Sequence, residues 1–211
     1  MQTGGSQSQS AHLEALTEQG IGLPDPIAVL MEDHELQLQL CDVLEKIADN
    51  LPESIEPELG LVVARILRKG MPQHMRFEED VLFPLLRKRA VWEDELEHVL
   101  RQLEGEHASG ESYGFEIADE LEALSECDHV SNPEMLGYML RGFFDSQRRH
   151  IEWENTIVFP FARRVLTQDD LHALREQLLN HLSARQARQS LLMVQAVLAG
   201  NHQDVSSVAS N

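Results

Sequence analysis

One eleven-residue pattern occurs twice in this chain, and it constrains the fold more than any other feature. HMRFEEDVLFP begins at His74 and HIEWENTIVFP begins at His150, so both copies read H-x-x-[F/W]-E-x-x-x-[L/V]-F-P. A helix turns about 100° per residue, so residues four apart lie on the same face. The first copy therefore pairs His74 with Glu78, and the second pairs His150 with Glu154. The repeat predicts either a duplicated packing motif or two copies of one chemical device that face each other.

Apolar residues recur every three or four positions along most of the chain, which is the spacing of amphipathic helices. Asn132 and Pro133 are a typical N-cap and first helical residue, and the segment 167–170 is typical of a second helix start. No alternation of apolar and polar residues predicts a strand. We therefore expect an all-α fold, an antiparallel up-down four-helix bundle with an additional C-terminal helix. The expected helices cover about 27–48, 57–89, 91–126 and 133–166, with a fifth from 167 onward.

The length of 211 residues fits one domain with flanking segments. The first residues are rich in Gly, Ser and Gln, which favours a flexible tail over 1–22. We expect the bundle to occupy 23–166, a helical extension to follow over 167–200, and the residues 201–211 to be disordered.

Charge and composition exclude several classes of partner. The formal net charge is −19, which repels phosphate, so nucleic acid and anionic membrane surfaces are poor partners. No apolar run approaches the ~20 residues of a membrane span, and the N-terminal segment lacks the basic start and apolar stretch of a signal peptide. Cys41 and Cys127 form no disulfide framework. The expected location is the cytoplasm.

Each of the four predicted apolar stripes contains a histidine where a leucine would be usual: His34, His74, His107 and His150. His34 has apolar residues above and below it, whereas His107 is followed by Glu111 in a third H-x-x-x-E spacing. The chain therefore consists of two helical hairpins, each arranged as H … HxxxE. Folding one hairpin onto the other would bring four imidazoles and at least two carboxylates together. Such a donor set suits Fe, Mn or Zn, and a carboxylate from each half can bridge two ions.

Simpler explanations exist for each element of this pattern. A single H-x-x-x-E pair on a helix is usually a solvated ion pair, and a single histidine on an apolar face is usually hydrogen-bonded in the core. The conjunction of four histidines and two repeated carboxylates favours a metal site, because a buried polar group without a partner costs roughly 1–3 kcal/mol. A purely structural polar core remains the alternative.

The segment HMRFEEDVLFP, within the order H … HxxxE … H … HxxxE, resembles the hemerythrin-like (HHE cation-binding) domain family over roughly residues 25–166. The resemblance implies an up-down four-helix bundle around a non-haem dinuclear iron centre. It implies two iron ions, with an oxo or hydroxo bridge as an option and Mn or Zn as other occupants. The implied terminal ligands are His34, His74, His107 and His150, and the implied bridging carboxylates are Glu78 and Glu154.

Two departures from the oxygen-carrying members shape the expected function. Those members have H-x-x-x-H on the third helix, where this chain has His107 and Glu111, and an Asp five residues after the fourth-helix histidine, where this chain has Asn155. We include Glu111 among the expected ligands. Additional anionic oxygen should favour ferric iron and weaken reversible O₂ binding. The expected role is therefore sensing or handling of O₂, NO, peroxide or iron rather than oxygen transport, with a small diatomic or peroxide ligand.

The alternative function is a di-iron redox enzyme with catalase- or peroxidase-like activity. A homodimer through the C-terminal helix is a further option. His98 lies on the opposite face of its helix from His107 and is expected in solvent. Glu79 is expected to be exposed or to support a ligand, and Gln147 either to hydrogen-bond a ligand or to pack at the edge of the core.

Several small features near the expected site have two interpretations each. Phe77 and Trp153 either shield the site from water or pack in the core. Gly110 and Gly114 either allow close helix approach or open a channel for a small ligand. The Phe-Pro ending of each repeat predicts a helix kink, since proline removes a backbone donor, with the phenylalanine packed at the bend.

Overall fold

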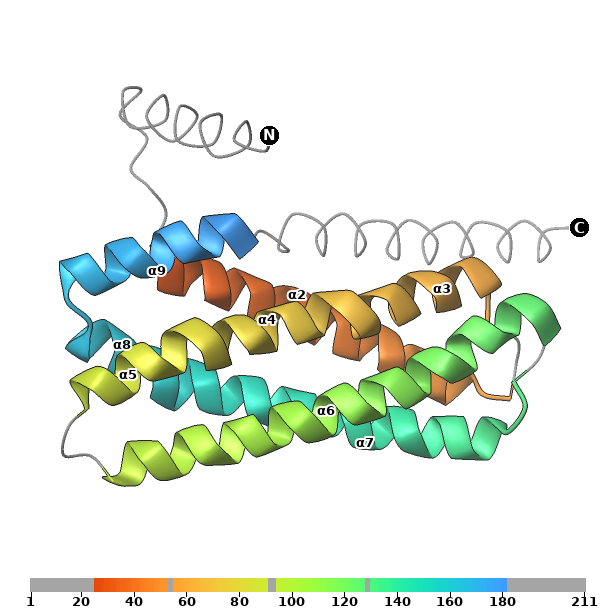
Figure 1. Ribbon diagram of the computed structural model, residues 1–211. Helices are drawn as coiled ribbons and strands as arrows, with labels where there is room; N and C mark the ends of the chain where they lie inside the picture. Colours follow the sequence, from red (N-terminus) through yellow and green to blue (C-terminus); the bar gives the residue numbers. More distant parts are fainter. Residues whose placement is uncertain (1–24, 53–54, 91–93, 128–129, 182–211) are drawn as a thin grey trace, which may run out of the picture.

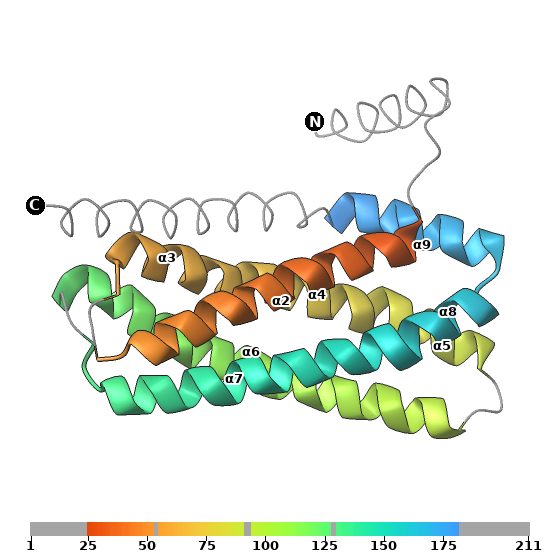
Figure 2. The same cartoon turned by 180° about the vertical axis from the view of Figure 1, so that it is seen from behind.

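The computed structural model describes residues 25–52, 55–90, 94–127 and 130–181. In these ranges the chain is helical and contains no strand. The long helical segments lie side by side, and the shorter helix α9 (Gln168–His181) lies along their outside near one end (Figures 1 and 2). The predicted tails over 1–22 and 201–211, and the part of the extension beyond residue 181, lie outside the described residues. No described helix is long and apolar enough to cross a membrane.

The four long segments run alternately up and down, which confirms the predicted antiparallel bundle (Figure 1). The first and third segments are the single helices α2 (Pro26–Asn50) and α6 (Asp94–Cys127). The second segment contains α3 (Pro57–Arg65), η1 (Ile66–Gly70), α4 (Met71–Phe77), η2 (Glu78–Leu82) and α5 (Phe83–Arg89). The fourth contains α7 (Pro133–Trp153), η3 (Glu154–Val158) and α8 (Phe159–Val165). In the bundle, α2 packs along α7, and α3 packs along α6.

Side-chain caps fix several helix starts. The side chain of Asn132 accepts a hydrogen bond from the backbone N–H of Met135 at 3.0 Å, with Pro133 as the first helical residue, as predicted. Asp25 caps α2 in the same way through the N–H of Ile27 at 3.1 Å. These local contacts set where the first and fourth long segments begin.

A π-helical turn precedes Pro72, Pro84 and Pro160, where the sequence pattern predicts only a kink at the two Phe-Pro pairs. In each case the residue before the proline bonds five residues back: the N–H of Phe83 donates to the carbonyl of Glu78, and that of Phe159 donates to Glu154. A proline ring in a regular helix would clash with the carbonyl four residues back. The π-turn removes this conflict by widening the backbone, and such turns are frequent at functional sites.

Two apolar clusters fill the bundle, and a polar layer separates them. Along α2, Ile27 and Leu30 belong to one cluster, whereas Leu40 and Leu44 belong to the other. Between them lies His34, which is fully buried. The third segment has the same order, and the second and fourth, which run in the opposite direction, have the reverse order, so the buried polar residues of all four lie at one level of the bundle.

The fifth helix, α9 (Gln168–His181), packs on the outside of α2 and α4. Its start confirms the cap predicted over 167–170: the N–H of Asp170 donates to the hydroxyl of Thr167 at 3.2 Å, and the N–H of Thr167 donates to the carboxylate of Asp170 at 2.9 Å. Arg89 donates two further bonds to Asp170, at 2.7 and 2.9 Å. Leu174 is buried in the apolar cluster below. These contacts join α9 to the end of α5.

Candidate metal centre

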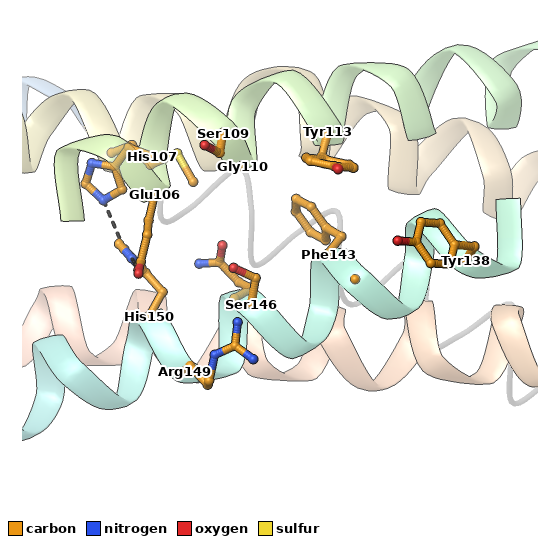
Figure 3. A pocket seen from close by; sticks show the side chains of 13 residues that line it. Glu106, His107, Ser109, Gly110, Tyr113, Tyr138, Phe143, Ser146, Arg149 and His150 are labelled. Atoms are coloured by element: carbon orange, nitrogen blue, oxygen red, sulfur yellow. Dashed lines mark hydrogen bonds and ion pairs between the residues drawn. The ribbon is translucent and has the colours of Figure 1, made fainter. Parts of the chain in front are cut away.

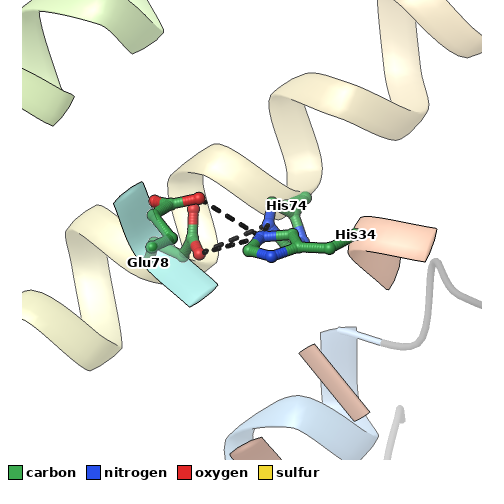
Figure 4. A group of neighbouring side chains, drawn as sticks. His34, His74 and Glu78 are labelled. Atoms are coloured by element: carbon green, nitrogen blue, oxygen red, sulfur yellow. Dashed lines mark hydrogen bonds and ion pairs between the residues drawn. The ribbon is translucent and has the colours of Figure 1, made fainter. Parts of the chain in front are cut away.

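Six side chains from the four long segments meet in the polar layer, each at most 5% exposed. They form two groups whose donor atoms lie within 4.8 Å of one another, and both groups contain Glu78 and Glu154. The first group is completed by His34 of α2 and His74 of α4; Figure 4 shows these two rings turned toward Glu78. The second group is completed by His107 of α6 and His150 of α7. The full set is His34, His74, Glu78, His107, His150 and Glu154.

Both glutamates have oxygen atoms close to both groups. Glu78 Oε1 lies 3.3 Å from Nε2 of His74, whereas its Oε2 lies 3.5 Å from Nε2 of His107. Glu154 Oε2 lies 3.2 Å from Nε2 of His34 and 3.2 Å from Nε2 of His150, and its Oε1 lies 3.8 Å from Nε2 of His107. Each carboxylate therefore spans two donor groups, which is the arrangement of a carboxylate that bridges two ions.

The histidine Nε2 atoms meet in pairs inside the cluster. The distance is 3.1 Å between His34 and His74, and 3.0 Å between His107 and His150 (Figure 3). Two nitrogen ligands bound to one ion at about 2.1 Å, at right angles to each other, would lie roughly 3 Å apart. The spacing of each pair therefore fits a shared ion.

The carboxylate oxygens provide the test of whether a metal fits. All four oxygens of Glu78 and Glu154 are buried and have no hydrogen-bond partner. Both residues are 0% exposed, and their charged oxygens lie 3.2–3.8 Å from imidazole nitrogens, so a cation, either imidazolium or a metal ion, must balance their charge at this depth. The donor set contains two imidazole nitrogens and two carboxylate oxygens for each group, which is the chemistry that Fe, Mn and Zn use. The residues present fit a pair of first-row transition-metal ions.

Polar side chains outside the cluster orient the two rings of the second group. The Nδ1–H of His107 donates to Glu79 at 2.7 Å, and the Nδ1–H of His150 donates to Glu106 at 3.0 Å. A hydrogen bond at Nδ1 leaves Nε2 as the unprotonated nitrogen that a metal requires. Both rings are therefore held in the tautomer that suits ligation.

The first group has matching partners. The Nδ1–H of His34 donates to the side-chain oxygen of Asn155 at 2.8 Å, and Nδ1 of His74 lies 3.5 Å from Asp33. One of these two partners is a neutral amide, whereas both partners in the second group are carboxylates. The two groups thus share a geometry and differ in charge.

Phenylalanines of the repeat stack on the histidines of the opposite half. Phe159 lies 4.9 Å from His34, centroid to centroid, with the rings 16° apart. Phe83 lies 6.0 Å from His107, with the rings 9° apart. The phenylalanine of each Phe-Pro pair therefore fixes an imidazole face, in addition to packing at the π-turn.

The metal-free cluster holds protons. Burial lowers the pKa of His150, but Glu154 and Glu106 outweigh that effect and raise it to about 10. Burial likewise opposes protonation of His74, and Glu78 and Asp33 hold its pKa well above the usual value. Burial would raise the pKa of Glu154, but His150 and the other imidazoles hold it well below the ordinary value. These shifts favour imidazolium and carboxylate as the charge states of the metal-free cluster.

Glu111 is the one predicted ligand that the structure does not bring to the cluster. It lies in neither donor group, and its carboxylate accepts a hydrogen bond from Arg76 at 3.2 Å near the surface. Glu111 follows His107 by one helical turn, but its side chain pairs with Arg76 of α4 at the surface and not with the cluster. The i,i+4 spacing alone could not reveal that contact.

Other sequence expectations have mixed outcomes. His98 is exposed, as expected, and Gly114 packs closely against Phe143 and Leu67. Trp153 is 42% exposed and does not shield the cluster, whereas Phe77 is buried. Gln147 is buried and donates to the side chain of Gln37 at 2.9 Å rather than to a histidine. Asp33 and Glu106, which contact Nδ1 of His74 and His150, were not expected from the sequence, although each directly precedes a histidine of the cluster.

A pocket opens beside the second group. It has a volume of about 320 Å³, lies between α6 and α7, and reaches His107 and His150 at one end (Figure 3). Gly110 lines it, in keeping with the expected channel for a small ligand. Neither histidine of the first group lines the pocket, so it gives access to one half of the centre.

Comparison with known proteins agrees with this arrangement. The family model described as Hemerythrin HHE cation binding domain matches residues 25–162, a range that includes every residue of the cluster. No curated protein and no solved structure matches the chain. The match covers more than half of the chain and includes both buried groups of histidine and glutamate side chains, so the protein belongs to the hemerythrin HHE cation-binding domain family.

Proposed function

We propose that this protein holds a dinuclear non-haem iron centre. His34 and His74 would bind one ion, His107 and His150 the other, and both carboxylates would bridge the ions. The bridging residues are Glu78 and Glu154, and Glu111 is not a ligand in this proposal. The observation that carries it is the position of the four carboxylate oxygens, which are buried, lack a hydrogen-bond partner and lie 3.2–3.8 Å from Nε2 atoms of both histidine pairs.

A bound pair of iron ions would supply two one-electron redox steps and coordination positions for a small ligand, since the protein offers four donors to each ion. The residues around it prepare the site. Glu79 and Glu106 hold the imidazoles of the second group in the ligating tautomer. The apolar clusters on both sides of the polar layer exclude bulk water, which strengthens electrostatic interactions inside the layer.

The proposed role is reaction with, or sensing of, O₂, NO, peroxide or iron itself, rather than oxygen transport. Each donor group contains two nitrogens and two carboxylate oxygens, and the position where oxygen carriers of the family have another third-helix histidine is held by Glu111, which turns to Arg76. Anionic oxygen ligands stabilise ferric iron, because the higher charge interacts more strongly with them. A centre that favours the ferric state would release O₂ poorly.

A second candidate function is peroxide consumption. The observation in its favour is the pocket, which leads from the surface to His107 and His150 and contains the carboxylate of Glu106. The carboxylate of Glu106 could accept a proton from a peroxide in the pocket and return it. Oxygen evolution from hydrogen peroxide, measured with an oxygen electrode on the iron-loaded protein, distinguishes this candidate from a sensor.

Metal analysis tests the central proposal. We expect the purified chain, reconstituted anaerobically with ferrous iron, to bind two iron ions per chain by elemental analysis. The oxidised form should show a magnetically coupled ferric pair by Mössbauer spectroscopy. Glu154→Gln should lose at least one of the two ions. Glu152→Gln is the matched control, because Glu152 is exposed on the same helix. A folded protein that binds no transition metal under these conditions would refute the proposal.

A further inference from the structure

The pocket beside His107 and His150 is much larger than the ligands considered so far. Its volume of about 320 Å³ lies at the lower end of the ~300–1,000 Å³ typical of small-molecule sites. One water molecule occupies roughly 30 Å³ of liquid volume, so a diatomic molecule or hydrogen peroxide would fill only a small part of the space. The volume is that of an organic molecule.

The pocket exists because the second half of the repeat departs from the first. In the first half, the residue three positions after His34 is the buried Gln37. In the second half, the residue three positions after His107 is Gly110. Six residues after the same histidines, Leu40 is buried in the first half, and Tyr113 is 48% exposed in the second. Gly110 has no side chain and Tyr113 turns outward, whereas Gln37 and Leu40 fill the corresponding space in the first half. This difference opens the groove between α6 and α7.

The first half is closed in addition by α9, which packs on α2 and α4. Access is therefore different at the two ends of the centre. A molecule that enters between α6 and α7 meets the donor group of His107 and His150. The side chains at this inner end are nearly buried, whereas the outer end is open to solvent.

The lining changes character along the pocket. Met75 and Phe143 form a buried apolar wall, and the rings of Tyr113 and Tyr138 stand at the outer part (Figure 3). Arg149 lies at the edge near His150 and is the one basic side chain in this lining apart from the histidines; the carboxylate of Glu106, which accepts from His150, lines the same end. Aromatic walls favour a flat apolar body, and a cation beside a metal position favours an oxygen head with negative charge.

We propose that this pocket binds a small aromatic molecule with an oxygen head, a carboxylate or a phenol, whose head reaches the ion held by His107 and His150. The inference rests on the proposed metal centre and adds the ligand class. The ring lies between the tyrosines and the wall of Met75 and Phe143. Arg149 pairs with the negative head.

Gly142 provides the test. It lines the pocket, and a Cβ built there meets no atom within 4 Å, so a larger side chain grows into the cavity without moving the backbone. Gly142→Leu also replaces a poor helix former by a good one, so the fold is preserved. The matched control is Gly105→Leu, because Gly105 is equally free of neighbours and does not line the pocket.

Isothermal titration of the diferric protein with benzoate, phenol and azide gives the readout. We expect benzoate or phenol to bind the wild type, and Gly142→Leu to weaken that binding by about tenfold or more. Azide, which needs only the metal position, should bind both proteins alike, and Gly105→Leu should behave as the wild type. Benzoate and phenol distinguish the two kinds of head.

The outcomes separate this inference from the metal proposal. If the protein binds two iron ions and azide but neither aromatic probe, the pocket inference is wrong and the metal centre stands. If Gly142→Leu weakens azide as much as the aromatic probe, the effect lies at the metal and the inference is also wrong. Failure to bind iron at all refutes the proposed function first.

Discussion

The carboxylate of Glu79 lies 2.7 Å from Nδ1 of His107, although the two residues belong to different halves of the repeat. The opposite contact is present as well, since Asn155 in the second half accepts from His34 in the first at 2.8 Å. The phenylalanines make the same kind of contact between halves: Phe83 stacks on His107, and Phe159 stacks on His34. Each half thus orients the lone histidine of the other, so neither half has a complete site by itself.

Glu79→Gln should weaken metal binding at the second group. The substitution keeps the side-chain size and removes the charge that stabilises the Nδ1–H of His107. Loss of such a partner typically lowers metal affinity 10- to 100-fold, and we expect a value in about this range for one of the two ions. Competition with a chelator measures it. Asp80→Asn removes an exposed charge from the next position and should leave the affinity unchanged.

Glu111→Gln should leave the metal content at two ions per chain. Its carboxylate is about one-third exposed and pairs with Arg76. Such a surface pair contributes ~0–1 kcal/mol to stability, so the melting temperature should change little. Elemental analysis of the reconstituted variant provides the measurement. Loss of an ion in this variant would show that Glu111 turns inward when metal binds.

Metal binding should release protons and strengthen as the pH rises. The pKa of His150 is raised to about 10 by Glu154 and Glu106 despite burial, and that of His74 is raised as well. Both imidazoles therefore carry protons at neutral pH in the metal-free protein and must lose them to bind an ion. Titration calorimetry in buffers of different ionisation enthalpy counts the protons. An affinity that is independent of pH between 6 and about 9 would contradict this prediction.

The same shifts predict how the stability of the metal-free protein changes with pH. The pKa of His150 is higher in the folded protein than in the unfolded chain, so protonation of His150 stabilises the fold. This stabilisation is complete below about pH 6.5 and is lost as the pH rises toward about 10. We expect the melting temperature of the metal-free protein to fall over that window. The melting temperature of the iron-loaded protein should fall less, because metal ions rather than protons balance the negative charge of the two glutamates. Thermal unfolding of both forms across the window measures the difference.

Asp170→Asn should loosen α9. Asp170 completes the cap with Thr167 and receives two bonds from Arg89, so its loss removes the link between α9 and α5. We expect a loss of about 1–2 kcal/mol in the free energy of unfolding, measured by urea denaturation. Hydrogen exchange should increase in α9 and leave the cluster protected. Asp169→Asn, at the exposed neighbouring position, should have little effect.

The sequence by itself determined the parts that depend on local geometry. Helical periodicity, the caps at Asn132 and Thr167, and the pairing of His74 with Glu78 follow from the turn of a helix and from hydrogen bonds within a few residues. The four histidines could be selected because each interrupts an apolar stripe that must face the core. That constraint holds for any packing of the four helices.

Only the tertiary structure decided how the helices meet. In the folded chain Glu79 contacts His107, Glu111 contacts Arg76, and a pocket lies beside the pair of His107 and His150. These contacts join residues 28 and 35 positions apart, or further. They depend on the rotation and axial stagger of neighbouring helices, which π-turns before the prolines adjust and which periodicity does not encode.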